Sequence, residues 1–350
     1  MTLSYGSDAT STELAAGLSD VLSAKCDLDH VRRVWSEGEF DRSLWDEVSS
    51  LSFWGALIPE ADGGLGVRSE DVVRSLEEFG YSGASLPLTE TVAVVVPTIH
   101  RFADDEMRDR LLPGLLSGAS VSTAAVMPGG TVALFADVAD VALVAAEDGL
   151  YVLERDQFTV EPVHSPDPTS RLGRIKPRPD AFTPHARLGE GALDEARLRA
   201  VWATAAVLNG VSRRMLDLTV EHTKQREQFG RAIGTFQAVK HLAADAWVAV
   251  ESSRPCSWYA AYAHQEGLPD AAVAASVAMA SASDAARLVG DSALQLHGGI
   301  GFTWEHPLHF WLKRGKLLEH SYGSRQFHLR TLGVAIRDEQ AGSEALFADV

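Results

Sequence analysis

The chain has 350 residues, and its 48 acidic side chains outnumber its 31 basic ones to give a formal net charge of −17. This balance excludes nonspecific binding to nucleic acid or to an anionic membrane, because both need a basic protein surface. A hydrophobic share of 46% and a charged share of 23% are ordinary for a globular protein, and the length allows two or three packed domains.

The sequence predicts a cytoplasmic protein. The first ten residues, MTLSYGSDAT, contain neither a basic nor an apolar segment of the kind that forms a secretory signal. The apolar runs Val92–Val96 and Ala200–Val207 are too short to span a bilayer. Cys26 and Cys256 lie far apart in the sequence and form no ligand cluster, which is typical of reduced thiols.

Residues 1–118 are predicted to form a helical domain. Apolar residues recur at helical spacing in four segments, Thr12–Leu22, Ser43–Leu51, Arg68–Gly80 and Asp104–Leu116. We expect Ser69 to cap the third of these helices, since an apolar pair follows it at the right distance. A proline and three glycines within residues 57–66 indicate a loop between helices.

Residues 119–190 are predicted to form a reduced β domain. Val141–Ala146 and Leu150–Glu154 are short apolar runs on either side of Glu147-Asp148-Gly149, which is a hairpin signal. Phe158–Val163 and Ala186–Leu188 are expected to add further strands. Proline-rich loops separate these runs.

Residues 191–340 are predicted to form a bundle of long helices, followed by a tail over 341–350. The helical segments are Leu198–Lys224, Phe236–Ala263 and Ala271–Gln295. Between the first two lies R-E-Q-F-G, residues 226–230, and we expect Gly230 and Gly234 to turn an αα corner there.

Polar side chains gather at this corner. Arg226, Gln228 and Gln237 place planar donors and amides at a helix end, where unpaired backbone groups favour a polar or anionic partner. After the third helix, Gln295–Phe302 contains three glycines in four residues, which lets a backbone approach a ligand closely.

In this order, R-E-Q-F-G, F-Q-x-x-K-H and Q-x-H-G-G-I-G-F resemble the signature of the acyl-CoA dehydrogenase family. The resemblance implies a mainly α fold with a small β domain: an N-terminal helical domain, a middle β-barrel and a C-terminal four-helix bundle. It also implies contacts with an FAD that a neighbouring subunit holds for the most part. The residues implied in those contacts are Arg226, Gln228, Phe229, Gln237, Gln295, Gly298 and Gly299.

Two features that the family needs for catalysis are missing. The family takes its general base from one of two positions, and counting along this chain from Arg226 and from Gly298 reaches Ala200 and Tyr322, neither of which is a carboxylate. Glu319 and Glu195 are the nearest substitutes, and we expect both to be solvated helix charges. The family's flavin-ring segment, T-E-P-x-x-G-S-D, is replaced by Ala124–Thr131 with no G-S-D after it.

This combination resembles the non-catalytic partner subunit of the heteromeric, α2β2 acyl-CoA dehydrogenases of actinobacterial steroid side-chain breakdown. The implied partners are a homologous catalytic subunit, an acyl-CoA with a bulky or steroid-derived acyl group, and an electron-transfer flavoprotein. Two alternatives stay open: a self-sufficient homotetrameric enzyme with Glu319 or Glu195 as base, and a flavin-free scaffold of the same fold.

Two further patterns bear on the site. His297, His306 and His309 are close in sequence, but they lack the i, i+4 spacing of a helical zinc pair, so no metal site is predicted. The small residues of the first long helix indicate either room for a bulky acyl group or close packing of helices. These residues are Ala200, Ala203, Ala205 and Ala206.

Overall fold

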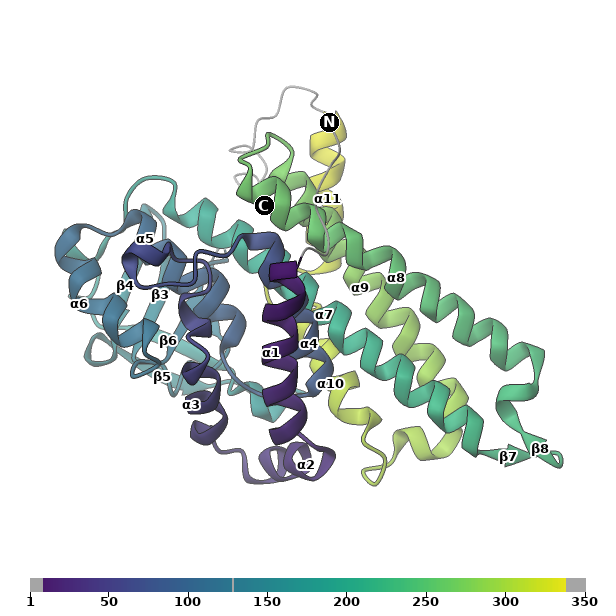
Figure 1. The fold of residues 1–350 in the computed structure, drawn as a ribbon. Coiled ribbons are helices and arrows are strands. Elements are labelled where there is room, and N and C mark those ends of the chain that lie inside the picture. Colours follow the sequence, from purple (N-terminus) through teal and green to yellow (C-terminus); the bar gives the residue numbers. More distant parts are fainter. Residues whose placement is uncertain (1–8, 128, 338–350) are drawn as a thin grey trace.

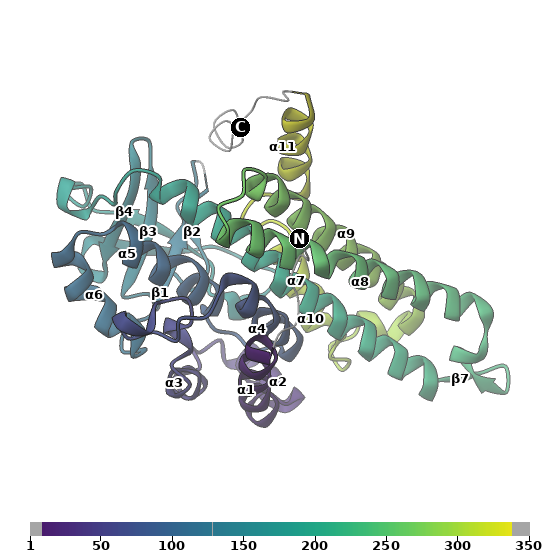
Figure 2. The ribbon, with the colours of Figure 1, turned by 45° about the horizontal axis from the view of Figure 1, so that its top comes forward.

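The computed structural model describes residues 9–127 and 129–337, which form a mainly helical chain with a small β region (Figure 1). The predicted fold class is therefore confirmed. Strands β1–β6 lie at one end of the molecule, and the β7–β8 hairpin lies at the opposite end in both views (Figures 1 and 2). Cys26 and Cys256 are free, as expected. The predicted tail lies outside the described residues.

The N-terminal region is built from six α-helices. They are α1 (Ala9–Lys25), α2 (Leu28–Glu37), α3 (Arg42–Ser50), α4 (Ser69–Ser82), α5 (Val96–Phe102) and α6 (Asp105–Leu116). The side chains of Asp27, Asp41 and Asp104 accept hydrogen bonds from the backbone N–H groups in the first turns of α2, α3 and α6, which stabilises these starts. The four predicted helices are confirmed, whereas α2 and α5 were not predicted.

The predicted cap of α4 is wrong by one residue. Ser69 is the first residue of the helix, and Arg68 precedes it as the cap, with its N–H donating to Asp71 Oδ2 at 3.2 Å. Ser69 donates instead to the side-chain oxygen of Gln265, from its hydroxyl at 2.9 Å and its N–H at 3.1 Å. The serine therefore ties α4 to the C-terminal bundle.

The apolar run Val92–Val96 lies in a helix that the sequence patterns did not indicate. Residues Thr89–Val95 form a π-helix, which continues directly into α5. All seven side chains of this π-helix are buried. Such segments are rare and are often found at functional sites.

The middle region holds two three-stranded sheets, in the orders β1-β3-β4 and β2-β6-β5. The strands are β1 (Ser122–Ala125), β2 (Val132–Ala133), β3 (Val141–Ala146), β4 (Gly149–Glu154), β5 (Phe158–Pro162) and β6 (Gly173–Pro177). The predicted hairpin is confirmed, because β3 and β4 pair antiparallel up to Ala146 and Gly149. The strand predicted over Ala186–Leu188 is wrong: a helical turn at Pro184–Ala186 leaves only one bridge, from Arg187 to Tyr151.

The C-terminal region contains the three long helices that the sequence predicts, together with two shorter ones. They are α7 (Ala192–Gln225), α8 (Gln237–Gln265), α9 (Ala271–His297), α10 (Leu308–Leu318) and α11 (Arg325–Arg337). The segment Ala271–Phe302 is long and apolar enough to cross a membrane, but 67% of its most apolar window is buried. Since α9 packs against α7, α8 and α11, it is the core helix of the bundle.

Helices α4 and α7 meet backbone to backbone. A Cβ atom added at Gly80 would lie 2.0 Å from the carbonyl oxygen of Val207, and one added at Gly210 would lie 1.9 Å from that of Glu77. Only glycine allows such an approach. The four alanines considered above are also fully buried. These contacts favour close helix packing over an open acyl pocket as the reason for the small residues of α7.

Candidate functional site

The hairpin between α7 and α8 is exposed from Arg226 to Arg231. The side chain of Phe229 is 93% accessible, and exposure extends to every residue that the resemblance implied in flavin contacts. These residues are Arg226, Gln228, Phe229, Gln237, Gln295, Gly298 and Gly299. None of the residues that the structure describes covers them, so they are available to a partner or a ligand.

The corner is a two-residue β-hairpin rather than the αα turn expected from its glycines. Strands β7 (Glu227–Gln228) and β8 (Arg231–Ala232) pair antiparallel. Phe229 and Gly230 form the turn with φ of +55° and +77°, the signs that a type I′ hairpin requires. A phenylalanine in this conformation is strained, and such strain is often kept at functional positions. Gly234 has no positive φ and instead lies against Thr223.

The chemistry of the corner suits an anionic, planar ligand. Arg226 and Arg231 supply guanidinium groups, and Arg231 lies 4.1 Å above the centre of the Phe236 ring. Gln237 is the first residue of the 29-residue helix α8, so the unpaired N–H groups of a helix start stand beside these cations. Helix starts of this kind bind phosphate groups.

The glycine-rich loop has free space in front of it. A Cβ atom added at Gly299 would meet nothing within 4 Å, and its φ lies outside the left-handed region. No contact among the described residues therefore requires glycine at this position, whereas a group that comes close from outside would. Gly298 does need glycine for its own backbone, since its φ is +61°.

Stacked histidines join the corner to this loop. His222, four residues before Arg226, stacks on His297, which directly precedes Gly298, with ring centres 4.4 Å apart. His306 approaches His297 at the same centre distance, edge to face. Burial, followed by the charges of its neighbours, lowers the pKa of His306 to about 4. The two motifs thus lie side by side at the end of the bundle that carries the β7–β8 hairpin, opposite to strands β1–β6 (Figure 1).

His309 does not belong to this group. It is buried against the rings of Trp35, Trp304 and Phe310. Of the three histidines that are close in sequence, His297 and His306 thus meet in space, together with His222, whereas His309 lies apart from them.

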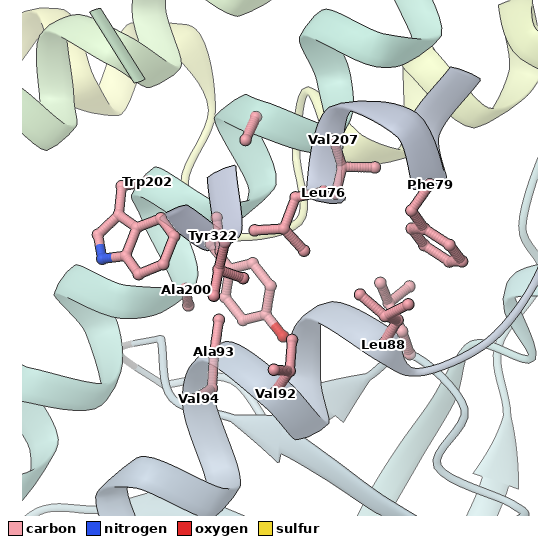
Figure 3. Close-up of a cluster of buried hydrophobic side chains, with 14 of the residues drawn as sticks. Leu76, Phe79, Leu88, Val92, Ala93, Val94, Ala200, Trp202, Val207 and Tyr322 are labelled. Carbon is pink, nitrogen blue, oxygen red and sulfur yellow. The ribbon is translucent and has the colours of Figure 1, made fainter. Parts of the chain in front are cut away.

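The two family base positions lie in a closed core. Ala200 and Tyr322 are both buried and belong to one hydrophobic cluster (Figure 3). The Tyr322 hydroxyl lies 3.2 Å from Glu90 Oε1 and 3.4 Å from the carbonyl oxygen of Ala124, and it can donate to either. Tyr322 thus joins the C-terminal bundle to the π-helix and to β1.

Glu90 is a carboxyl group that the sequence motifs did not reveal. Its burial raises its pKa to about 7, although hydrogen bonds from its own backbone and from Tyr322, and the charge of Arg314, act against this rise. A carboxylate with a pKa near neutral is what a general base needs. The feature of the sequence that could have indicated a buried carboxyl group was a single acidic residue inside the apolar run Thr89–Val96.

The space around Glu90 is small. A cavity of about 30 Å³ remains beside it, lined also by Phe79, Leu134, Phe135 and Leu317. This volume holds a water molecule but not an acyl chain.

Glu319 and Glu195, the two substitutes for the base, are both held in ion pairs. Glu319 directly follows α10 and pairs with Lys316 at 3.1 Å. Glu195, in the first turn of α7, pairs with Arg199 at 2.8 Å, His264 at 3.0 Å and Arg101 at 3.3 Å. Their side chains are only 13% and 11% exposed, so the expectation of solvated charges is wrong for both.

The surroundings of Glu195 make it a poor base. Burial alone would raise its pKa, but the hydrogen bond from His264 and the charges of Arg199 and Arg101 outweigh burial and hold the pKa well below its usual value. A carboxylate held in this way takes up a proton only in acid.

A larger cleft lies between the middle region and α10. Its volume is about 610 Å³, and its walls include Trp35, the loop 162–166, Trp304 and Lys313. The Lys313 ammonium lies 3.7 Å from the centre of the Trp304 ring. This volume falls within the range of sites for small molecules and cofactors.

Two family models match the chain. They are described as acyl-CoA dehydrogenase, N-terminal domain, over residues 9–119, and acyl-CoA dehydrogenase, C-terminal domain, over residues 190–336. Among curated relatives, the acyl-CoA dehydrogenase IpdE2 of Mycolicibacterium smegmatis is 34% identical over 298 residues, which cover 85% of this chain and 89% of that protein.

Solved structures of heteromeric complexes are similar over nearly the whole chain. A variant of the Tcur3481–Tcur3483 steroid ACAD is 30% identical, with a TM-score of 0.87 over 94% of this chain and 98% of that one. The ChsE4–ChsE5 complex of Mycobacterium tuberculosis gives a TM-score of 0.89 over 97% of this chain and 100% of that one. Its identity is 24%, so it supports the fold alone.

Proposed function

This chain belongs to the acyl-CoA dehydrogenase family, and from that premise we propose that it is the partner subunit of a heteromeric enzyme. In this role it completes the FAD site of a homologous catalytic subunit and does not supply the base. The enzyme desaturates a CoA thioester between its α and β carbons. When bound, FAD accepts the β-hydride, while a base on the catalytic subunit removes the α-proton.

One observation carries the proposal: the corner and the glycine-rich loop are exposed, while both base positions are sealed in the core. A chain that bound its own acyl-CoA would need space beside a base. Here Tyr322 fills the second base position, and about 30 Å³ remains beside Glu90. A chain that served a partner's flavin would need only the corner and the loop.

The residues of the corner would hold the dinucleotide from outside. Arg226 suits a phosphate, because guanidinium groups bind phosphate through two parallel charge-assisted hydrogen bonds. Gln228, Gln237 and Gln295 offer amides to the adenosine or the diphosphate. Gly299 leaves room for the ligand to approach the backbone.

Exposed apolar side chains near this site support assembly with a second subunit. Phe229, Phe302 and Trp304 are 93%, 73% and 68% exposed, and Trp247 and Val248 are exposed on α8. Apolar and aromatic groups exposed together are typical of protein interfaces. The flavin and these rings would be covered in one step when the subunits join.

The similar proteins support a finer assignment. The Tcur3481–Tcur3483 structure is described as a steroid ACAD, and relatives at 33–34% identity are acyl-CoA dehydrogenases named IpdE2. We therefore assign to this chain an α2β2 assembly, a bulky or steroid-derived acyl-CoA, an electron-transfer flavoprotein as acceptor and a cytoplasmic location.

Co-expression tests the proposal directly. The chain alone should be colourless, and the chain purified with its catalytic partner should carry about half a flavin per chain, since each pair of subunits forms one site. In that complex, Arg226→Ala should weaken flavin binding by about 10- to 100-fold, the value of a lost charge-assisted hydrogen bond. Arg174→Ala, on the exposed face of β6, is the matched control and should change nothing. One flavin per chain in the protein expressed alone would refute the proposal.

A second candidate rests on Glu90 and the larger cleft. In a self-sufficient dehydrogenase, Glu90 would act as the base after Tyr322 moves aside, and the cleft of about 610 Å³ would hold part of the cofactor. Glu90→Gln separates the two candidates. It should abolish turnover in a self-sufficient enzyme and leave turnover of a heteromeric complex within about twofold of the unmodified complex, because its base lies on the other subunit.

A further inference from the structure

Three histidines from distant parts of the chain meet at one point. His222 lies in the last turn of α7, His297 is the last residue of α9, and His306 lies in the segment before α10. One ring nitrogen from each lies within 4.8 Å of the other two. His297 and His306 are close in sequence, but His222 lies 75 residues before His297, so the sequence alone does not bring the three together.

The ring of His297 is oriented for a ligand. Its Nδ1 lies 2.8 Å from the carbonyl oxygen of Ala293, which accepts a hydrogen bond and so places the proton on Nδ1. The lone pair is then on Nε2. That atom is buried and has no hydrogen-bond partner among the described residues, and the whole residue is only 6% exposed. Metal-binding histidines are held in the same way, with the second nitrogen donating to a carbonyl.

We propose that His222, His297 and His306 bind a divalent transition-metal ion of the zinc class. Neutral imidazoles favour zinc, copper and nickel over calcium and magnesium, which prefer oxygen ligands. Three histidines leave the fourth tetrahedral position open to water or to an external ligand. His222 and His306 are half-buried, so the site opens to solvent on their side.

The rings must draw together for binding. Zinc–nitrogen bonds of about 2.0–2.1 Å place tetrahedral ligand atoms about 3.4 Å apart, so the group has to contract by up to roughly 1.4 Å. The two half-buried rings can make this movement by rotating about their side-chain bonds. His306 also accepts a hydrogen bond from the N–H of Leu308 at 3.2 Å, and this long bond would be given up if Nδ1 became the ligand.

Such an ion would tie together the ends of α7 and α9 and the start of α10. The corner follows His222 by four residues, and the glycine-rich loop follows His297 directly. The metal would thus fix the spacing of two segments that belong to separate helices, and add positive charge next to Arg226. This inference does not depend on the proposed function, because the three ligands belong to this chain alone.

The test measures metal binding by the full chain without flavin or partner. Metal-free protein is titrated with Zn²⁺ against a chromogenic chelator, and with Co²⁺, whose visible absorption reports tetrahedral coordination. We expect one ion per chain with a micromolar or lower Kd. His222→Ala and His306→Ala should each weaken binding by at least about 100-fold, since even supporting residues of metal sites contribute 10- to 100-fold.

Controls make the result decisive. His320→Ala removes an exposed histidine outside the group and should leave zinc binding unchanged. His297→Gln keeps the size of the buried side chain in case alanine destabilises the fold, and it should also abolish the tetrahedral cobalt spectrum. Zinc binding that survives in His222→Ala and His306→Ala, or a Kd above about 1 mM in the unmodified chain, would overturn the proposal.

Discussion

The corner between α7 and α8 and the core around Tyr322 contrast in exposure, although the resemblance to the family implied a role in one site for both. At the corner, the polar side chains are present and no segment within residues 9–127 or 129–337 covers them. In the core, Tyr322 and Ala200 occupy the two positions reached by counting to the family's base, and both are buried. Helices α4 and α7 pack closely there. If the proposed function holds, the difference teaches that a fold can keep its binding surface while its reaction centre becomes part of the packing.

The largest expected effect is a loss of stability when a glycine of the core, Gly210, is replaced. Gly210→Ala would place a Cβ atom 1.9 Å from a backbone oxygen of α4. Alanine favours a helix by about 1 kcal/mol over glycine, but the backbone clash outweighs this gain, so we expect a loss above about 3 kcal/mol in the free energy of unfolding. Gly333→Ala is the matched control in α11, where an added Cβ meets nothing, and it should not destabilise the chain. Urea unfolding measures both.

At the glycine-rich loop, Gly299→Ala should leave the stability of the chain unchanged and weaken the binding of flavin. The chain alone should unfold at the same urea concentration as the unmodified protein, because the added Cβ has no neighbour within 4 Å. The complex with its partner should lose flavin affinity, because the methyl group occupies the space of the ligand. If this variant destabilised the chain and left the flavin content intact, the loop would have a structural role only.

The next largest effect concerns the pH dependence of stability. The pKa of Glu90 is about 7 in the folded chain and near 4.5 when unfolded, so between these values the folded state binds the extra proton. The stability from Glu90 is fully present below pH 4.5 and is lost as the pH rises through 7, by about 3 kcal/mol in total. Glu90→Gln removes this loss, so its advantage over the unmodified chain in urea unfolding should grow from pH 5 to pH 8. A constant difference across this range would show that Glu90 stays ionised.

The smallest effect is expected at the hairpin. Asparagine followed by glycine is the preferred pair for a type I′ turn, so Phe229→Asn should stabilise the chain alone by up to about 1 kcal/mol. The same change removes an exposed ring from the proposed interface, and should weaken association of the subunits. Thermal unfolding of the chain and sedimentation of the complex measure the two results. Unchanged association would place Phe229 outside the interface.

The sequence predicted the long helices well, because helical periodicity runs through 25 or more residues of α7, α8 and α9. It failed where local signals are short or conflicting. The π-helix Thr89–Val95 is a run of β-branched residues typical of a strand, and only burial on all sides explains its helical form. At the corner, the glycines indicated a turn, but the hairpin depends on a phenylalanine that adopts an unfavourable φ.

The candidate site was predictable only where its residues lie in sequence motifs. Counting along the chain reached Ala200 and Tyr322, and the fold brings these two residues into one buried hydrophobic cluster. Glu90 and His222 escaped notice because their roles come from contacts with residues 232 and 75 positions away, respectively. Such contacts are set by tertiary packing, and no local pattern records them.

The hydrogen bond from Tyr322 also bears on how the chain folds during synthesis. Glu90 and Ala124 leave the ribosome about 200 residues before the tyrosine that contacts them both. Until that tyrosine arrives, the nascent N-terminal half carries a carboxyl group with no hydroxyl partner and a gap where the ring will lie. This part of the core can therefore close only after Tyr322 has left the ribosome, and such late docking prolongs the exposure of apolar surface in a nascent chain.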